Sequence, residues 1–372
     1  MRPQMQHLSQ SGLAVALAFA GMQTLGAQSL DIGARIAPQF NSYKIDSPSN
    51  LTISEFAVPL YVVVPVNSRL SFDLGTSYAQ SRVEQSGATK AVSTISGLTD
   101  TQIRGNLTLG TDFVVLTAGV NLPTGNSTVT LDQQRAAGLI GSDFLSFPIS
   151  NMGTGFGGTG GIAIARPVGQ WNVGAGVSLR RSADYEPFDA VDGTALHYQP
   201  GNEYRARFGV DHPVGTGRVT FGLTYSTFGD DNLAGSIYNT GNRYLSQIDF
   251  DNSFGPGRIA VSGWNLFRTR GTLADGTLLD HENIANGAVA YSIPAGAAVI
   301  EPNVEARSWT QVGSPTSYLG TFGLRAQFGM GGLIVVPSAG YSVGQIAAES
   351  PTSSTTTATL TGFHGSLAIR IR

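Results

Sequence analysis

Residues 203–226 read EYRARFGVDHPVGTGRVTFGLTYS, and this stretch decides the fold. Its apolar residues recur at every second position on both sides of a central Pro-Val-Gly-Thr turn; they are Tyr204, Ala206, Phe208, Val210, Val219, Phe221, Leu223 and Tyr225. Successive side chains of a β-strand point to opposite faces, so each half is predicted to be a strand. The stretch therefore predicts an antiparallel hairpin with one apolar face and one polar, glycine-rich face.

The same pattern repeats along the chain in segments of about 10–14 residues. Short turns join the segments at residues 65–68, 110–112, 167–169, 213–216, 255–257, 294–296 and 330–332. Longer polar stretches lie near residues 44–50, 84–98, 123–156, 184–200, 229–241, 270–282, 310–316 and 345–357. Seven turns and eight loops join sixteen strands.

The alternation of short and long connectors is typical of periplasmic turns and extracellular loops. The sequence therefore predicts an all-β fold: a transmembrane antiparallel up-and-down β-barrel of about 16 strands, covering residues 28–372, in the bacterial outer membrane. Fourteen strands is the alternative, because segment 258–268 loses its alternation after Gly263 and segment 332–343 is short and contains Pro337. A water-soluble β-sandwich would not explain the connector lengths.

The composition agrees with a barrel. Charged residues make up 13% of the chain, against about 25% in ordinary soluble domains. A helical membrane protein would contain apolar runs of about 20 residues, and none follows residue 27. The net charge of −3 leaves no basic surface for a nucleic acid, so no nucleic-acid partner is expected.

Residues 1–27 resemble a cleavable secretory signal. Arg2 supplies the positive start, residues 12–21 (GLAVALAFAG) form a short apolar core, and Leu25-Gly26-Ala27 offers a cleavage site with small residues. The apolar core is too short for a transmembrane helix. We therefore expect the mature chain to begin at Gln28.

The polar faces of the strands are expected to line the lumen. Acidic and basic residues are nearly balanced on these faces, which argues against a strongly ion-selective pore and predicts inward ion pairs between neighbouring charges. Candidate binding residues on the lumen wall are Arg104, Arg205, Arg207, Asp249, Glu305 and Arg325.

The longest predicted loop contains an unusual apolar segment, LIGSDFLSFPI, at residues 139–149. Such a segment has to be buried. It either folds into the barrel mouth as an apolar site or plug, or packs as an ordinary loop without a ligand. The candidate binding residues here are Leu139, Ile140, Phe144, Leu145 and Phe147.

Several short motifs between about residues 95 and 345 are similar to those of a known family. They are SGLTD at 96–100, LPTG at 122–125, the hairpin 160–180 with its Arg-Pro-Val-Gly turn and Trp171, IEPNVE at 300–305 and VPSAGY at 336–341. Together they resemble the phenol meta-pathway degradation-type outer-membrane transporters, distant relatives of the FadL-type channels. The resemblance implies passive uptake of small hydrophobic or aromatic molecules.

This chain departs from the FadL-type pattern in two ways. Alternation begins at Leu30, so no segment is left for the N-terminal hatch of those channels. Fourteen strands are usual in that group, and sixteen are expected here. Separately, outer-membrane barrels in general usually end in an aromatic residue that the barrel-assembly machinery reads, and this chain ends in Ile371-Arg372.

Other function classes are weaker. His364 and Ser366 share one face of the last strand, but Phe363 directly before His364 does not match the Phe-x-His-x-Ser motif of barrel deacylases. We therefore expect no enzyme, no catalytic residue, no metal and no cofactor. The alternatives to a hydrophobic-solute channel are a general diffusion porin and a structural or lipid-modifying barrel. Expected partners are outer-membrane lipids, the barrel-assembly machinery during biogenesis, and small hydrophobic solutes.

Overall fold

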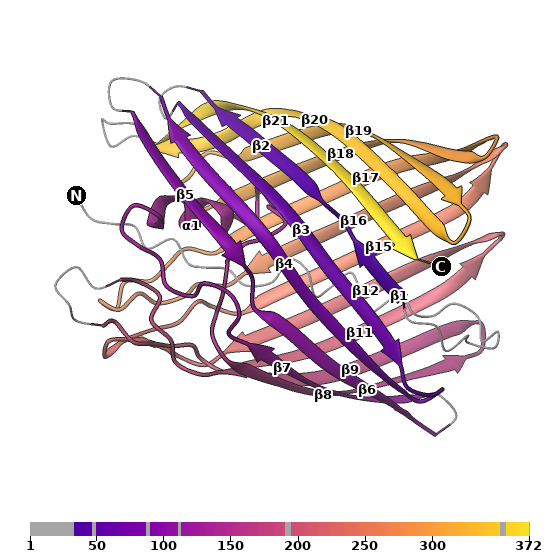
Figure 1. The fold of residues 1–372 in the computed structure, drawn as a ribbon, viewed down its shortest axis with the longest axis horizontal. Helices are drawn as coiled ribbons and strands as arrows, with labels where there is room; N and C mark the ends of the chain where they lie inside the picture. The colour runs from indigo at the N-terminus through magenta and orange to yellow at the C-terminus, as the bar shows by residue number, and fades with distance from the viewer. Residues whose placement is uncertain are drawn as a thin grey trace.

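The computed structural model describes residues 33–46, 50–86, 90–110, 113–189, 195–349 and 355–371. One sheet of eighteen strand segments forms a barrel (Figure 1). Three further short strands form a second, separate sheet. The predicted all-β fold is confirmed. The predicted signal peptide, residues 1–27, lies outside the described residues.

The barrel segments are β1 (Gly33–Ile36), β2 (Gln39–Ile45), β3 (Leu51–Pro65), β4 (Leu70–Gln85), β5 (Ala91–Leu98), β6 (Thr101–Leu109), β7 (Val114–Leu122), β8 (Gly157–Val168), β9 (Trp171–Ser182), β11 (Glu203–Val214), β12 (Gly217–Phe228), β15 (Arg243–Phe254), β16 (Gly257–Arg268), β17 (Glu282–Ala295), β18 (Ala298–Gln311), β19 (Ser317–Met330), β20 (Leu333–Glu349) and β21 (Thr355–Ile371). The small sheet contains β10 (Tyr198–Gln199), β13 (Asp231–Leu233) and β14 (Ser236–Tyr238). The helix α1 (Gln134–Ile140) lies between β7 and β8.

The eighteen segments make up sixteen strands, because two of the strands are each interrupted and consist of two consecutive segments. β1 and β2 both pair with β3 on one side and with β21 on the other. β5 and β6 both pair with β4. All pairings are antiparallel, and the pairing of β21 with β1 and β2 closes the sheet. The prediction of sixteen strands is confirmed.

All seven predicted short turns join consecutive strands. Six of them begin with a glycine of positive φ, as at Gly215 (φ 59°) and Gly255 (φ 57°), a conformation that the tight primed turns of hairpins require. Two strands are longer or more regularly paired than the sequence suggested. β16 pairs without interruption over twelve residues and has no bulge after Gly263, and β20 is seventeen residues long despite Pro337.

One predicted loop, residues 84–98, is wrong in its second half. Residues 91–98 form β5, which pairs with the upper part of β4. The outward residues of β4 in this region are the exposed Gln80, Arg82 and Glu84. This part of the wall therefore rises above the apolar surface, where a strand no longer needs an apolar outer face.

The outer surface of the barrel fits a lipid bilayer. Large apolar side chains are exposed on it, as at Val177 (59%) and Phe322 (65%). Outward aromatic residues lie near both ends of β15, Tyr244 and Phe254, ten residues apart. A membrane-spanning strand needs about 9–11 residues, and closure pairs the backbone groups that lipid cannot satisfy. The protein is a bacterial outer-membrane β-barrel.

Candidate functional site

Residues 123–156, here called the mouth loop, fold into the end of the barrel where the long loops gather. α1 lies there, close to β5 (Figure 1). The predicted residues Ile140, Phe144, Leu145 and Phe147 are 1–6% exposed, and Leu139 packs against them. The same apolar cluster includes side chains of the barrel strands: Ile45, Leu51, Ile53, Ala57, Ala79, Val83, Ile95, Leu319, Ala348, Ala358 and Leu360. The predicted burial of this segment is confirmed.

The mouth loop is tied to nearly opposite walls. On β3, the carboxylate of Glu55 accepts the backbone N–H of Ile149 at 2.9 Å. On β16, Arg268 forms an ion pair with Asp143 at 2.8 Å, and on β18 Arg307 donates to the carbonyl of the next loop residue at 2.7 Å. β3 and β16 are the second and eleventh of sixteen strands. The loop therefore crosses the barrel mouth.

Asp100, between β5 and β6, holds both ends of the mouth loop. One carboxylate oxygen accepts the N–H of Gly125 at 3.1 Å, and the other accepts the N–H of Thr154 at 2.6 Å and the amide of Asn121 at 2.8 Å. A Cβ at Gly125 would lie 2.1 Å from the carbonyl oxygen of Met152, so only glycine fits there. The loop leaves and re-enters the wall at one point.

The loop between β9 and β11 packs on the mouth loop. The N–H of Val129 donates to the carbonyl of Pro187 at 3.0 Å, and the N–H of Asp189 donates back to the carbonyl of Val129 at 3.1 Å. These two bonds join the mouth loop to a second long loop.

The small sheet adds an aromatic group above the second loop. The ring of Tyr198 lies 5.3 Å from that of Tyr185 and 6.2 Å from that of Tyr238. Burial raises the pKa of Tyr238 to about 12 and also raises the pKa of Asp231, which accepts the N–H of Gly201 at 2.7 Å. The three tyrosines are each partly buried and together form one aromatic group.

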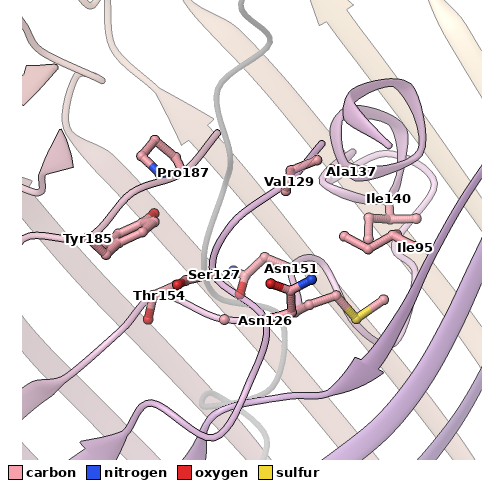
Figure 2. Close-up of a pocket in the computed structure, with 12 residues that line it drawn as sticks. Ile95, Asn126, Ser127, Val129, Ala137, Ile140, Asn151, Thr154, Tyr185 and Pro187 are labelled. Atoms are coloured by element: carbon pink, nitrogen blue, oxygen red, sulfur yellow. The ribbon is translucent and has the colours of Figure 1, made fainter. Parts of the chain in front are cut away.

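A small pocket lies between the two loops (Figure 2). Ile95, Ala137 and Ile140 form its apolar side, and Tyr185 and Pro187 stand across from them. Its volume is about 20 Å³, room for roughly one water molecule. A ligand of aromatic size would enter this pocket only if the mouth loop moved.

The predicted inward ion pairs are present for four of the six candidate residues on the lumen wall. The pairs are Arg104 with Asp73 at 3.1 Å, Arg205 with Glu203, Glu305 with Arg307 at 2.6 Å, and Arg325 with Glu301 at 3.3 Å. The other two candidates, Arg207 and Asp249, form no ion pair with any residue that the structure describes.

Sequence reasoning missed Arg243 and Arg268. Strand register places Arg205, Ser226, Arg243, Arg268 and Glu282 in one row across β11, β12, β15, β16 and β17. We call Arg205, Arg243 and Arg268 with their neighbour Arg207 the arginine row. The two missed residues stand at strand ends beside long loops, so only the register counted outward from each short turn could have found them.

The remaining polar candidates show no assembled reaction site. The hydroxyl of Ser366 is 2.7 Å from that of Ser338, across the β20–β21 pair, and no hydrogen bond joins it to His364 within the described part of the chain. The described part of the chain contains no group of His, Cys, Asp or Glu side chains that could hold a metal ion. Among the described residues, no helix has the length and apolar character needed to cross a membrane.

Comparisons with known proteins give likenesses of fold. No family model and no curated sequence matches the chain. Among solved structures, OmpT of Vibrio cholerae is 10% identical with a TM-score of 0.43, over 91% of this chain and 97% of that one. An anion-selective porin from Comamonas acidovorans is 10% identical with a TM-score of 0.41, over 92% and 99%. An outer membrane channel from Pseudomonas putida F1 is 13% identical with a TM-score of 0.38, over 94% and 98%.

The expectation that the chain is not an enzyme has to be corrected. Two of the similar barrels are the OmpT outer membrane protein and its loop-deletion mutant, so the similar structures are not all described as porins or channels. The exclusion of catalysis is withdrawn, and no residue of this chain is assigned a catalytic role.

Proposed function

We propose that this barrel is a gated channel for the passive uptake of small hydrophobic or aromatic molecules. The observation that carries the proposal is the apolar cluster of the mouth loop, with Phe144, Leu145 and Phe147 buried against the inner wall. Opening the mouth to water alone exposes this apolar surface, which is unfavourable. An apolar solute replaces the lost contacts, so it favours the open state.

The resemblance to the phenol meta-pathway transporters belongs to the same proposal. A closed apolar mouth suits the solutes that this family is expected to carry. We further propose that residues 1–27 are removed on export, that the assembly machinery inserts the chain, and that outer-membrane lipids surround it. Sequencing the amino terminus of the purified mature protein tests the cleavage; a first residue other than Gln28 contradicts the proposed site.

A general diffusion porin is the second candidate. The observation in its favour is the polar wall below the mouth loop, where Asp249 is exposed on the inward side of β15. A porin would admit sugars at a rate limited by their size, whereas a channel closed by an apolar loop would exclude them.

Uptake into lipopolysaccharide-containing liposomes separates the two candidates. We expect the wild-type barrel to admit naphthalene faster than protein-free liposomes do and to exclude glucose. The double variant Phe144→Ala/Phe147→Ala weakens the apolar cluster and is expected to admit glucose as well, since each buried Phe→Ala change costs about 3–5 kcal/mol. The matched control is Leu278→Ala, which alters an exposed apolar residue of another long loop. Rapid glucose entry through the wild type overturns the proposal in favour of a porin.

A further inference from the structure

The arginine row concentrates positive charge on one wall of the lumen. Arg243 and Arg268 are directly paired positions of β15 and β16, on the inner face of both strands. Like charges in directly opposed positions destabilise a sheet. Ser226 alone separates Arg243 from Arg205 in the same row.

The acidic partners of this wall do not saturate its guanidinium groups. Arg205 pairs with Glu203, and Arg268 lies between Asp143 at 2.8 Å and Glu282 at 2.6 Å. Arg207 and Arg243 form no ion pair within the part of the chain that the structure describes.

The arginine row also contains unsatisfied donors. The Nε atoms of Arg207, Arg243 and Arg268 are buried and have no hydrogen-bond partner among the described residues, and the guanidinium of Arg243 lies 5.6 Å from the ring centre of Phe228. Buried donors of this kind are ordinarily bonded, so each one needs an explanation. A guanidinium donates its strongest hydrogen bonds to an anion, and such an anion could approach these arginines from the lumen.

The arginine row lies near the boundary between the bilayer and the outside of the cell, and it lies beside the mouth loop. Each of its members on β15 and β16 is adjacent in sequence to an outward aromatic residue, Tyr244 and Phe267, whose rings are 6.3 Å apart. On the inner side, Arg268 holds Asp143 of the mouth loop. The buried Phe144 follows Asp143 directly, so the apolar cluster and the arginine row meet at this point.

We infer that the arginine row binds the carboxylate of a small organic acid whose apolar body contacts the mouth loop. The inference rests on the proposed channel function and specifies its substrate class. The substrate carboxylate exchanges with the carboxylate of Asp143 on Arg268, which removes one of the ties that hold the loop across the mouth. Arg243 and Arg207 supply guanidinium groups that form no ion pair within the described residues.

Binding to the full-length barrel in detergent tests the inference with three probes: benzoate, its neutral counterpart benzyl alcohol, and inorganic phosphate. For the variant Arg207→Gln/Arg243→Gln we expect benzoate to bind about tenfold more weakly, because two charge-assisted hydrogen bonds are lost. Benzyl alcohol should bind both proteins equally. Arg181→Gln is the matched control, because Arg181 follows Arg180 on β9 but is exposed on the outer face. Heat-modifiable migration on a gel verifies that each variant is folded.

Each outcome bears on one claim. Equal benzoate affinity in the wild type and the double variant overturns the inference, and so does phosphate binding as tight as that of benzoate, because the apolar body would then contribute nothing. Naphthalene uptake with no benzoate site leaves the channel standing and removes the arginine-row assignment. A benzoate site in a barrel that admits no aromatic solute supports the arginine-row assignment and contradicts the proposed channel function.

Discussion

Glu55 is 1% exposed on the inner wall of β3, where its carboxylate accepts the hydroxyl of Ser81 at 2.9 Å and the backbone N–H of Ile149. A buried carboxylate is stable only where hydrogen bonds replace its water. Ser81 lies on the adjacent strand β4 and Ile149 lies in the mouth loop. Glu55 therefore links the barrel wall to the loop that crosses the mouth.

Replacing Glu55 with alanine is expected to loosen the mouth loop without unfolding the barrel. The N–H of Ile149 loses its acceptor, and a buried unsatisfied donor costs about 1–3 kcal/mol. The measurement is amide hydrogen exchange across residues 139–149, which should become faster. Glu84→Ala, at an exposed outward position of β4, is the control and should leave exchange in this segment unchanged. Wild-type protection in the Glu55 variant would show that the apolar cluster alone holds the loop.

Asp231 gives the extracellular small sheet a pH dependence. Burial raises the pKa of this carboxyl, so the folded sheet holds its proton more tightly than the unfolded segment does. The stability that this protonated carboxyl gives to the folded sheet is fully present when the pH is below the pKa of an ordinary aspartate. It is lost as the pH rises through the raised pKa of Asp231. We expect protection of the β13 and β14 amides, corrected for intrinsic exchange, to fall as pH rises, and Asp231→Asn to abolish the change. A pH-independent wild type would contradict this.

The residues of the mouth were predictable from the sequence to different degrees. An apolar run such as Phe144–Leu145 inside a polar loop is a local signal, and burial follows from it directly. The arginine row is not local, because Arg243 and Arg268 meet only through the register of two strands whose intervening turn is eleven or more residues away from each. Asp100 stood in the SGLTD motif, but nothing in the sequence predicted that its carboxylate holds both ends of the mouth loop, because its partners are 21–54 residues away.

At the scale of elements, strand prediction succeeded where lipid imposes alternation. The turns and the strands between them followed from period two. β5 was missed because its outer side mixes the polar Thr94 and Ser96 with the exposed Val92 and Leu98 and so does not show a continuous apolar face. The same reasoning explains β20, which continues beyond the predicted end at residue 343 to Glu349.

α1 is the element whose movement the gating proposal requires. The hydroxyl of Ser93 on β5 accepts the N–H of Ala136 at 3.1 Å, so these positions are close. The chain contains no cysteine, and Ser93→Cys/Ala136→Cys therefore introduces one unambiguous disulfide. We expect the oxidised variant to lose aromatic uptake and the reduced variant to regain it, in the same liposome assay. Uptake that is unchanged on oxidation means that solute passes without movement of α1.

At the scale of the whole molecule, sixteen strands form the barrel, the mouth loop crosses one end of it, and the proposed function requires this loop to close the lumen. In planar bilayers the wild-type barrel should therefore show small, infrequent current steps. Deletion of residues 139–149 removes the apolar cluster from the mouth and should raise the single-channel conductance several-fold. Equal conductance before and after the deletion would place the constriction elsewhere in the lumen.

The junction at Asp100 has a consequence for how such a barrel can change. Because Gly125 and Thr154 are held by one carboxylate, the segment between them forms a cassette whose two ends meet at one point of the wall, and its other contacts with the barrel are made by side chains. Sequence inside the cassette can be exchanged, lengthened or shortened while the hairpins of the wall keep their register. A designer could graft other segments between these two residues, and natural selection could retune what enters the cell at the same place without rebuilding the cylinder.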